Sequence, residues 1–337
     1  MRRLPLMTLV AAVLLAACSS SPSPEASASS DGKVVMYSGR SETLIGPLLE
    51  QARTDLGLDI EVRYGSTAEM AAQLLEEGQR TPADLFLSQD AGALGELDQA
   101  QLLATLPTQT LEKVDAAYRA SDGGWVALTG RARAFVVPLG AESTAPQSVF
   151  DLTAPQWKNK VGIAPTNASF QSFITAMRVL KGEDVAEKWL RDMQANGVQI
   201  YKSNDQIVEA VADGKIAVGL VNHYYLFEVA KETGTAPNAA LAYTSEGDPG
   251  SLVNVSGVAI TGKGNQDLDA ITLVNYLLGT SAQRYFAEST NEYPMAKDAP
   301  AQPQGVPPLS SFKPIIPLEQ LSDLRGTLDL LSKVGLV

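Results

Sequence analysis

Cysteine is almost absent from this sequence of 337 residues, in which Cys18 is the only one. A single cysteine excludes an intrachain disulfide and a metal site built from several thiolates. Histidine is as scarce, because His223 is also alone, and the usual nucleophile–base pairs of hydrolases are therefore hard to assemble. The chain also lacks a Gly-x-Ser-x-Gly elbow and a Walker loop. We expect a protein that is not an enzyme, and a carboxylate-dependent enzyme of the cell envelope is the alternative in that class.

Positive charge is in the minority, with 26 lysines and arginines against 38 aspartates and glutamates and a formal net charge of -12. No basic stretch dominates, so we do not expect nucleic-acid binding. An acidic exterior fits a secreted protein and attracts cations mildly. The length and a hydrophobic fraction of 45% suffice for two domains with cores of their own.

The apolar run at residues 4–17 follows the positive pair Arg2 and Arg3 and is too short for an ordinary membrane span. It ends in Leu-Ala-Ala-Cys, and residues 1–17 resemble a bacterial lipoprotein signal peptide. The resemblance implies cleavage before Cys18, lipidation of that cysteine, and a lipid anchor on the extracytoplasmic side of the cell envelope. Residues 18–32 are mostly Ser, Ala and Pro, which predicts a flexible tether.

Strand and helix patterns alternate from residue 33 onward, which predicts an α/β fold with a mainly parallel sheet. Helix starts recur at strand ends in both halves of the chain. This repetition predicts two lobes with a cleft between them that closes about a hinge. We expect an N-lobe at residues 33–132 plus 255–305 and a C-lobe at residues 133–254 plus 306–337.

Three local predictions bear on this layout. The segment Gly130–Arg133 lies between two expected strands. If it is extended, Arg131 and Arg133 point to the same face, and at a turn they need not, so the pattern leaves open which of them reaches the cleft. A helix is expected from residue 90 to about residue 103. A closing helix is expected over residues 318–334.

A tyrosine pair follows the apolar strand pattern of residues 217–221 and precedes a helix pattern at residues 228–232. Tyr224 and Tyr225 therefore lie where a strand passes into a helix, and ligands in open α/β sheets bind at the carboxyl ends of strands. Two converging phenolates would suit a hard cation such as Fe(III). The alternative is that both rings pack while their hydroxyls stay in water. His223 is expected to face solvent if the tyrosines point inward.

Several short motifs together resemble the periplasmic ferric-iron-binding proteins of ABC transporters. They are Tyr37-Ser38-Gly39, Thr81-Pro82-Ala83-Asp84, Gly130-Arg131-Ala132-Arg133, Trp157-Lys158-Asn159-Lys160, Asn222-His223-Tyr224-Tyr225, Asp248-Pro249-Gly250 and Glu292-Tyr293-Pro294. The resemblance implies the two-lobed type II architecture of periplasmic binding proteins, with a hinge and an interlobe cleft. It also implies a monomeric substrate-binding protein that delivers iron to an ABC permease in the plasma membrane.

In that family the adjacent tyrosines bind iron, which implies Tyr224 and Tyr225 as ligands of Fe(III). Many members add a histidine after the first strand and a glutamate after the third, where this chain has Ser41 and Gln89. A further tyrosine that other members place near the start of a later helix is absent here, and Phe170 lies in that region. These departures leave open a second reading, in which the same fold binds an organic anion, a phosphate ester or a polyamine.

A charge count indicates what completes the iron shell. Fe(III) with two phenolates keeps one positive charge, which neutral Ser41 and Gln89 do not cancel. The resemblance implies a synergistic anion, and carbonate, phosphate and a citrate-like carboxylate all remain candidates. The implied anion-binding residues are Asn167, Ala168, Ser169, Asn204 and Asn222, with Arg40 and Arg131 as charged donors. Asn204 and Asn222 have an alternative reading as cap or turn residues. Asp90 is either a ligand or a helix cap, and we favour the cap.

Overall fold

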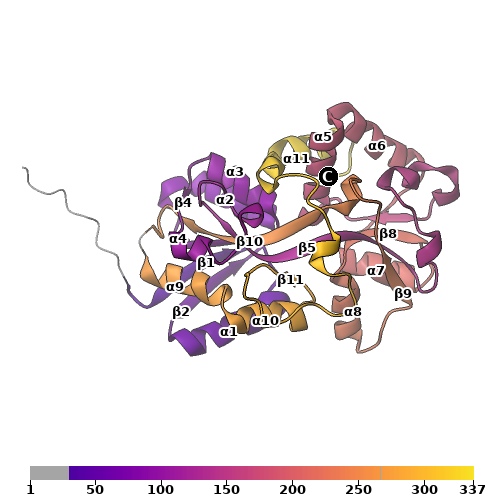
Figure 1. Ribbon diagram of the computed structural model, residues 1–337. Helices are drawn as coiled ribbons and strands as arrows, with labels where there is room; N and C mark the ends of the chain where they lie inside the picture. Colours follow the sequence, from indigo (N-terminus) through magenta and orange to yellow (C-terminus); the bar gives the residue numbers. More distant parts are fainter. Residues whose placement is uncertain (1–29, 266) are drawn as a thin grey trace, which may run out of the picture.

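The computed structural model describes residues 30–265 and 267–337. The predicted signal peptide, Cys18 and the tether up to residue 29 lie outside the described residues. Two α/β lobes lie side by side and are joined by long strands that run through the middle of the molecule (Figure 1). Among the described residues, no helix is long and apolar enough to cross a bilayer.

The first lobe contains a parallel three-stranded core in the order β2-β1-β3. Its strands and the helices between them are β1 (Lys33–Ser38), α1 (Glu42–Leu56), β2 (Asp59–Tyr64), α2 (Thr67–Glu77), β3 (Leu85–Ser88) and α3 (Ala91–Gln99). A capping box forms at Ser66, whose hydroxyl accepts from the Glu69 N–H while the Glu69 carboxylate accepts from the Ser66 N–H. Gly57 ends α1 in the left-handed conformation, with φ 67°.

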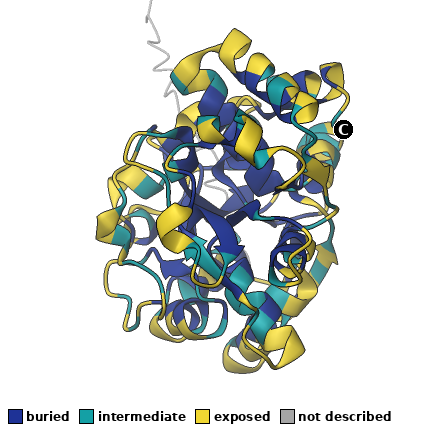
Figure 2. Cartoon of the chain, turned by 90° about the vertical axis from the view of Figure 1, so that its right-hand side faces the viewer, coloured by how far each residue is buried: buried dark blue, intermediate teal, exposed yellow. Residues whose placement is uncertain are grey.

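The second lobe has its own parallel strands in the order β8-β6-β7. Its elements are β6 (Val161–Ile163), α5 (Ala168–Lys181), α6 (Glu183–Ala195), β7 (Gln199–Ile200), α7 (Asn204–Ala212), β8 (Val218–Asn222), α8 (Tyr225–Thr233) and β9 (Ala239–Ala242). In the view turned by 90°, the buried strands lie behind helices whose outer faces are exposed (Figure 2).

Two long strands, β5 (Val126–Pro138) and β10 (Val253–Thr261), connect the lobes. Residues 126–132 of β5 pair with β10, and residues 133–136 pair with β8. Of the two conformations left open for Gly130–Arg133, the extended one is present, because this segment is part of a continuous strand. The glycine provides space rather than a bend: a Cβ atom at Gly130 would lie 1.8 Å from the Met295 side chain, next to β11 (Tyr293–Pro294).

The sheet is mixed, which corrects the expectation of a mainly parallel one. Pairs within each lobe are parallel, whereas β5 and β10 pair antiparallel with each other and with their neighbours. A strand that leaves one lobe and a strand that returns to it must run in opposite directions, and this is why the linking part of the sheet is antiparallel.

The remaining elements complete the first lobe and the C-terminus. They are β4 (Leu103–Ala104), α4 (Thr108–Leu111), α9 (Leu268–Leu277), α10 (Thr280–Ser289), the 3-10 helix η8 (Leu318–Leu321) and α11 (Leu324–Lys333). The helix expected up to residue 103 is too long, because α3 stops at Gln99 and Gln101 turns with φ 57°. The closing helix is broken at Ser322, after which Asp323 caps α11 by accepting from the Gly326 N–H.

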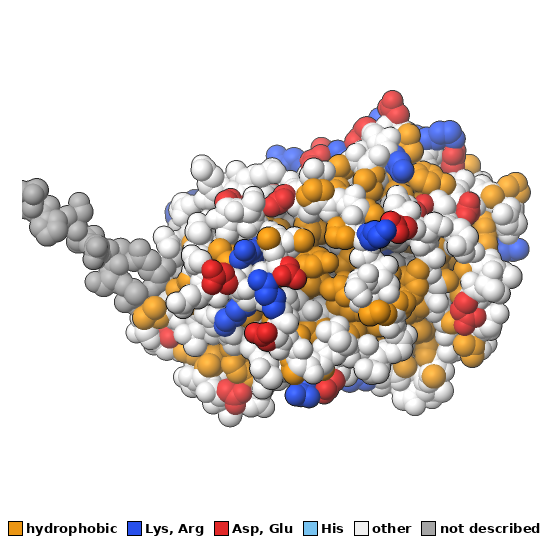
Figure 3. Space-filling model, in the orientation of Figure 1, with side chains coloured by type: hydrophobic (Ala, Val, Ile, Leu, Met, Phe, Trp, Pro, Cys, Tyr) orange, Lys and Arg blue, Asp and Glu red, His pale blue; other side chains and the backbone are white. Residues whose placement is uncertain are grey.

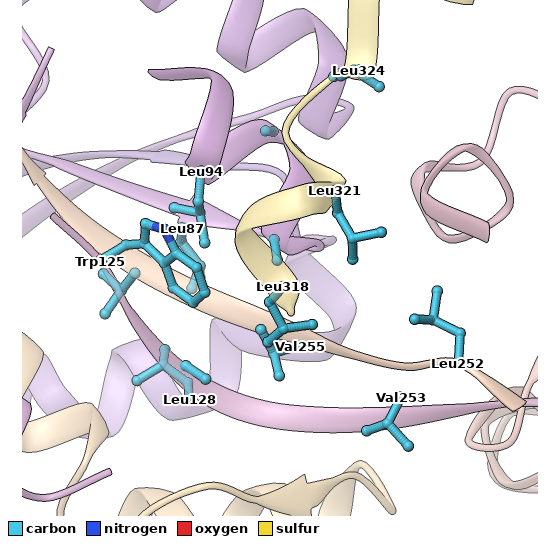
Figure 4. Close-up of a cluster of buried hydrophobic side chains, with 14 of the residues drawn as sticks. Leu87, Leu94, Trp125, Leu128, Leu252, Val253, Val255, Leu318, Leu321 and Leu324 are labelled. Carbon is cyan, nitrogen blue, oxygen red and sulfur yellow. The ribbon is translucent and has the colours of Figure 1, made fainter. Parts of the chain in front are cut away.

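The helix η8 covers the two linking strands. Leu318 and Leu321 lie in one buried cluster with Leu94, Trp125 and Val255 (Figure 4). On the face seen in Figure 3, hydrophobic side chains occupy the middle of the molecule, and acidic and basic side chains are scattered around them in mixed groups.

Candidate functional site

The tyrosine pair lies at the junction of β8 and α8. Tyr224 precedes the first residue of α8, which is Tyr225. Their ring centres are 4.2 Å apart and their planes are inclined by 29°. The rings are only 2% and 6% exposed, respectively. Burial and then the neighbouring Tyr225 hydroxyl raise the pKa of Tyr224 well above its ordinary value.

Both phenol oxygens converge on one side chain of the other lobe. The Gln89 Nε2 atom lies 3.4 Å from the Tyr224 hydroxyl and 3.2 Å from the Tyr225 hydroxyl. Gln89 follows β3, so the contact joins the two lobes across the cleft. The Asn167 Nδ2 atom lies 3.3 Å from the Tyr225 hydroxyl. Hydroxyls left in water, as the packing alternative expected, are not what the structure shows.

Asn167 also organises the start of α5. It is the N-cap of this helix, and its Oδ1 atom accepts from the backbone N–H and the hydroxyl of Ser169, at 2.9 and 2.6 Å. Ala168 is the first residue of the helix and is 8% exposed. The predicted trio of residues 167–169 therefore brings a helix N-terminus beside the tyrosines, where anions are favoured.

Arg40 and Arg131 share one buried carboxylate. Arg40 makes two parallel bonds to Glu292, at 2.9 and 2.8 Å, and its guanidinium carbon lies 5.8 Å from the centre of the Tyr224 ring. The Arg131 Nη1 atom is 3.8 Å from the same carboxylate, too far for a hydrogen bond. None of the three Arg131 nitrogens makes a hydrogen bond to a described residue, although Arg131 is 0% exposed.

The charges of this group influence one another. Burial and the positive charge of Arg40 lower the pKa of Arg131. Burial opposes charge on Glu292, but Arg40 and Arg131 outweigh it and hold the pKa of Glu292 below its ordinary value. The result is a buried ion pair beside a buried cation whose donors are free.

Arg133 lies two residues further along β5, but its donors are largely occupied. Its Nη1 and Nη2 atoms donate to the Ser169 hydroxyl and the Leu220 carbonyl, both at 3.1 Å. Burial lowers the pKa of Arg133 to about 9. Both arginines are therefore buried. All three side-chain nitrogens of Arg131 lack a partner among the described residues, whereas in Arg133 only Nε does.

Asn204 and Asn222 bring further buried polar atoms. Asn204 is 0% exposed, and its Oδ1 and Nδ2 atoms have no hydrogen-bond partner among the described residues. The helix-cap alternative does not hold for Asn204, because Ser203 is the N-cap of α7 and accepts from the Gln206 N–H. Asn222 ends β8 directly opposite Arg133, and its Nδ2 atom also lacks a described partner. Buried polar groups of this kind normally have partners, so they point to a polar ligand.

His223 does not face solvent, and that prediction is wrong. The side chain is 0% exposed. Its Nδ1 atom accepts from the Ala132 N–H at 3.1 Å, so Nε2 carries the proton and donates to the Asn291 carbonyl at 2.7 Å. Burial lowers the pKa of His223 to about 4. Two backbone groups that need partners thus hold the ring inside, where it ties β8 to β5.

The other two possible cleft residues, Ser41 and Asp90, make their hydrogen bonds elsewhere. Ser41 is exposed, and its hydroxyl pairs with that of Thr43 at 3.1 Å instead of capping α1 or meeting the tyrosines. Asp90 is buried and caps α3 by accepting from the Ala93 N–H at 3.2 Å, as favoured from the sequence. Of the three possible cleft residues, Gln89 is the one whose side chain reaches the tyrosine hydroxyls.

Glu292 was missed as a member of the site. The sequence marked it only within a turn motif, and no spacing links it to Arg40, 252 residues away. The position of Arg133 depends on whether residues 130–133 are extended, which the local pattern does not decide. Alternation along an extended strand would have put Thr129, Arg131 and Arg133 on one face.

Comparison with known proteins finds similar proteins whose matches cover most of the chain. The family model described as bacterial extracellular solute-binding protein matches residues 80–316. The Fe(3+)-binding periplasmic protein of Serratia marcescens is 31% identical over 314 residues, which are 92% of each chain. The major ferric iron-binding protein of Neisseria gonorrhoeae is 32% identical over 267 residues, 78% of this chain and 80% of that protein.

The structural similarity is equally extensive. Iron-bound HitA from Pseudomonas aeruginosa superposes with a TM-score of 0.84 and 30% identity, covering 90% of this chain and 99% of that one. The apo ferric ion-binding protein A of Pasteurella haemolytica gives a TM-score of 0.79 at 26% identity, covering 90% and 98% of the two chains. The two-lobed α/β fold predicted from the sequence and the resemblance to ferric-iron-binding periplasmic proteins are both confirmed.

Proposed function

Because the chain belongs to the family of bacterial extracellular solute-binding proteins, we propose that it binds ferric iron outside the cytoplasm and delivers it to an ABC importer. Tyr224 and Tyr225 are the protein ligands of the ion in this proposal. A synergistic anion completes the shell. The relatives described above are named for binding ferric iron, which supports the choice of cargo.

The convergence of the two phenol oxygens is the observation that carries the proposal. Oxygens within hydrogen-bonding distance of a single Gln89 nitrogen are close enough together to meet one ion. Phenolates are hard oxygen donors and suit Fe(III). Loading replaces two phenol protons by one ion of high charge, which stabilises the deprotonated form of each ring.

The buried arginines support an anion as the remaining ligand. Three arginines, Arg40, Arg131 and Arg133, are buried near the tyrosines, and Glu292 neutralises one of them. Adding a trivalent cation to this positive setting is unfavourable unless anions come with it. Arg131 offers free N–H donors at the place where such an anion would be needed. Asn167, with Ser169, Asn204 and Asn222, would supply neutral hydrogen bonds; carbonate, phosphate and a citrate-like carboxylate all fit this chemistry.

The remaining parts of the proposal concern the setting of the protein. Cleavage before Cys18 and its lipidation would tether a monomer at the outer face of a membrane, next to the permease. The lobes would comprise residues 33–132 plus 255–305 and residues 133–254 plus 306–337. The change of partner on β5 between Ala132 and Arg133 supports a hinge at this boundary.

A second candidate keeps the fold and omits the metal. The free donors of Arg131 are an observation that also favours an organic anion or a phosphate ester. The same buried arginines disfavour a polyamine, because like charges repel. A carboxylate-dependent enzyme gains no support from the relatives, which are named as iron-binding proteins.

The test is the visible spectrum of purified protein with ferric chloride and bicarbonate, phosphate or citrate. We expect a phenolate charge-transfer band with at least one anion. Tyr224→Phe combined with Tyr225→Phe should remove the band. A matched control is Tyr276→Phe on α9, whose hydroxyl contacts Asp55 instead, and it should leave the band unchanged.

The outcomes separate the two candidates. Iron and an anion together give colour and thermal stabilisation if iron is the cargo. Stabilisation by an anion or a phosphate ester alone, with no colour under any condition, supports the second candidate and contradicts the first. Retained colour in the double phenylalanine variant would exclude the tyrosines as ligands.

A further inference from the structure

Glu292 lies at the centre of the charges around the tyrosines without approaching them itself. It is 0% exposed, makes the two bonds to Arg40 described above, and accepts from the hydroxyls of Thr129 and Thr290, each at 3.0 Å. Four donors therefore hold the carboxylate in one orientation. A buried carboxylate held in this way keeps its charge and a fixed position.

The segment that carries Glu292 is fixed to the tyrosine turn. Asn291 adopts φ 52°, a left-handed conformation that asparagine tolerates better than most residues. In this conformation its carbonyl accepts from His223, the residue immediately before Tyr224. Glu292 thus connects three elements of the site: the turn after β1 through Arg40, the strand β5 through Thr129 and Arg131, and the turn after β8 through Asn291.

The Glu292 carboxylate contacts Arg40 and Arg131 differently. Arg40 is paired in a bidentate manner, whereas Arg131 is 3.8 Å away and keeps its donors free. The carboxylate therefore neutralises one cation and leaves the other to meet an incoming anion. The net charge that the anion experiences depends on this one side chain.

We propose that Glu292 is a specificity-determining residue that sets the charge of the anion accepted beside the tyrosines, favouring anions of low charge. The inference rests on the ferric site proposed above and extends it to the choice of anion. Glu292 acts through Arg40 and Arg131 and is a positioning residue, not a ligand of iron or of the anion.

The experiment compares anions of different charge on the iron-loaded protein at pH 8, where bicarbonate is mainly a monoanion and phosphate mainly a dianion. Anion exchange is followed by the shift of the charge-transfer band, and the ratio of the two dissociation constants is the measured quantity. Glu292→Gln makes the site more positive by one charge, and we expect the ratio to move toward phosphate by roughly tenfold per unit of anion charge. Arg40→Gln removes one positive charge and should move the ratio in the opposite direction.

Matched variants separate charge from folding. Glu292→Asp keeps the charge and should keep the ratio. The double variant Arg40→Gln with Glu292→Gln removes one charge of each sign, so the net charge is that of the wild type. Its ratio of dissociation constants should therefore return to the wild-type value. Tyr285→Phe removes a nearby hydroxyl that donates to the Leu44 carbonyl and adds no charge, so its ratio should not change.

The possible results distinguish failure of the Glu292 inference from failure of the proposed function. Should Glu292→Gln fail to fold, Arg40→Gln and the neutral double variant carry the same test. An unchanged ratio in coloured, folded charge variants overturns the inference and leaves the iron site intact. Absence of colour in the wild type with bicarbonate, phosphate and citrate alike refutes the proposed function itself.

Discussion

Replacing Gln89 by glutamate tests whether this position lies within reach of the bound ion. The Gln89 amide nitrogen contacts both phenol oxygens, at 3.4 and 3.2 Å, so a carboxylate of the same length would place an oxygen at the same point. Many members of the family that this chain resembles have a glutamate ligand after the third strand. Gln89→Glu therefore adds the negative charge that the iron shell of this chain lacks.

The magnitude follows from the charges. Two phenolates leave one positive charge on Fe(III), and a carboxylate about 4 Å from it gains about 4 kcal/mol at an effective dielectric constant of about 20. Part of this gain is offset by the desolvation of the carboxylate. We expect iron binding without added anion to strengthen by roughly a hundredfold, about 3 kcal/mol. The effect of added bicarbonate should shrink correspondingly, because the carboxylate supplies the missing charge.

The assay is competition for Fe(III) against nitrilotriacetate, with the charge-transfer band as the measure of loading, with and without bicarbonate. Gln99→Glu is the matched control: it adds the same charge to the same lobe, where Gln99 contacts Ser322 rather than the tyrosines. Equal iron affinity and equal bicarbonate dependence in wild type and Gln89→Glu would show that the side chain does not reach the ion. The reasoning from convergence would then fail.

Three further outcomes are expected. Iron affinity should fall roughly a hundredfold per unit decrease in pH, because loading displaces two protons, one from each of Tyr224 and Tyr225. The raised pKa of Tyr224 keeps its proton in place until iron binds. Iron affinity that does not change across a pH series would contradict this. Leu321→Ala should lower the free energy of unfolding by about 2–5 kcal/mol in denaturant titrations, because the side chain is 0% exposed. Leu139→Ala, at a side chain that is 64% exposed, should change it by less than about 0.5 kcal/mol. Cys18→Ala should abolish lipid attachment, visible as a lower intact mass and loss of the protein from the membrane fraction.

The features that sequence patterns predicted are local ones. The helix cap at Asp90 and the strand-to-helix junction before Tyr225 each depend on residues a few positions apart. Local hydrogen bonding and backbone freedom decide such features, so the sequence contains them directly.

The features that the sequence did not predict depend on distant partners. Gly130 interrupts the strand pattern locally, but β10 and β8 supply ladder partners for β5, and the segment is extended. His223 looks exposed by composition, yet the N–H of Ala132 and the carbonyl of Asn291 draw its ring inside. Pairings of this kind bring together residues far apart in the chain, and a short sequence pattern does not predict them.

In the function proposed above, the anion site and the hinge would share the strand β5, and anion binding would then be linked to lobe closure. Arg131 and Arg133 lie on β5 at the point where its pairing changes from β10 to β8. Gln89 approaches the tyrosines only from the opposite lobe, so an ion held between these side chains binds the closed arrangement better than an open one. A ligand shifts a conformational equilibrium only by its difference in affinity for the two states. In the proposed site, an ion bound by the tyrosines alone would favour neither arrangement of the lobes, whereas contacts with Gln89 and Arg131 would favour the arrangement that brings the lobes together.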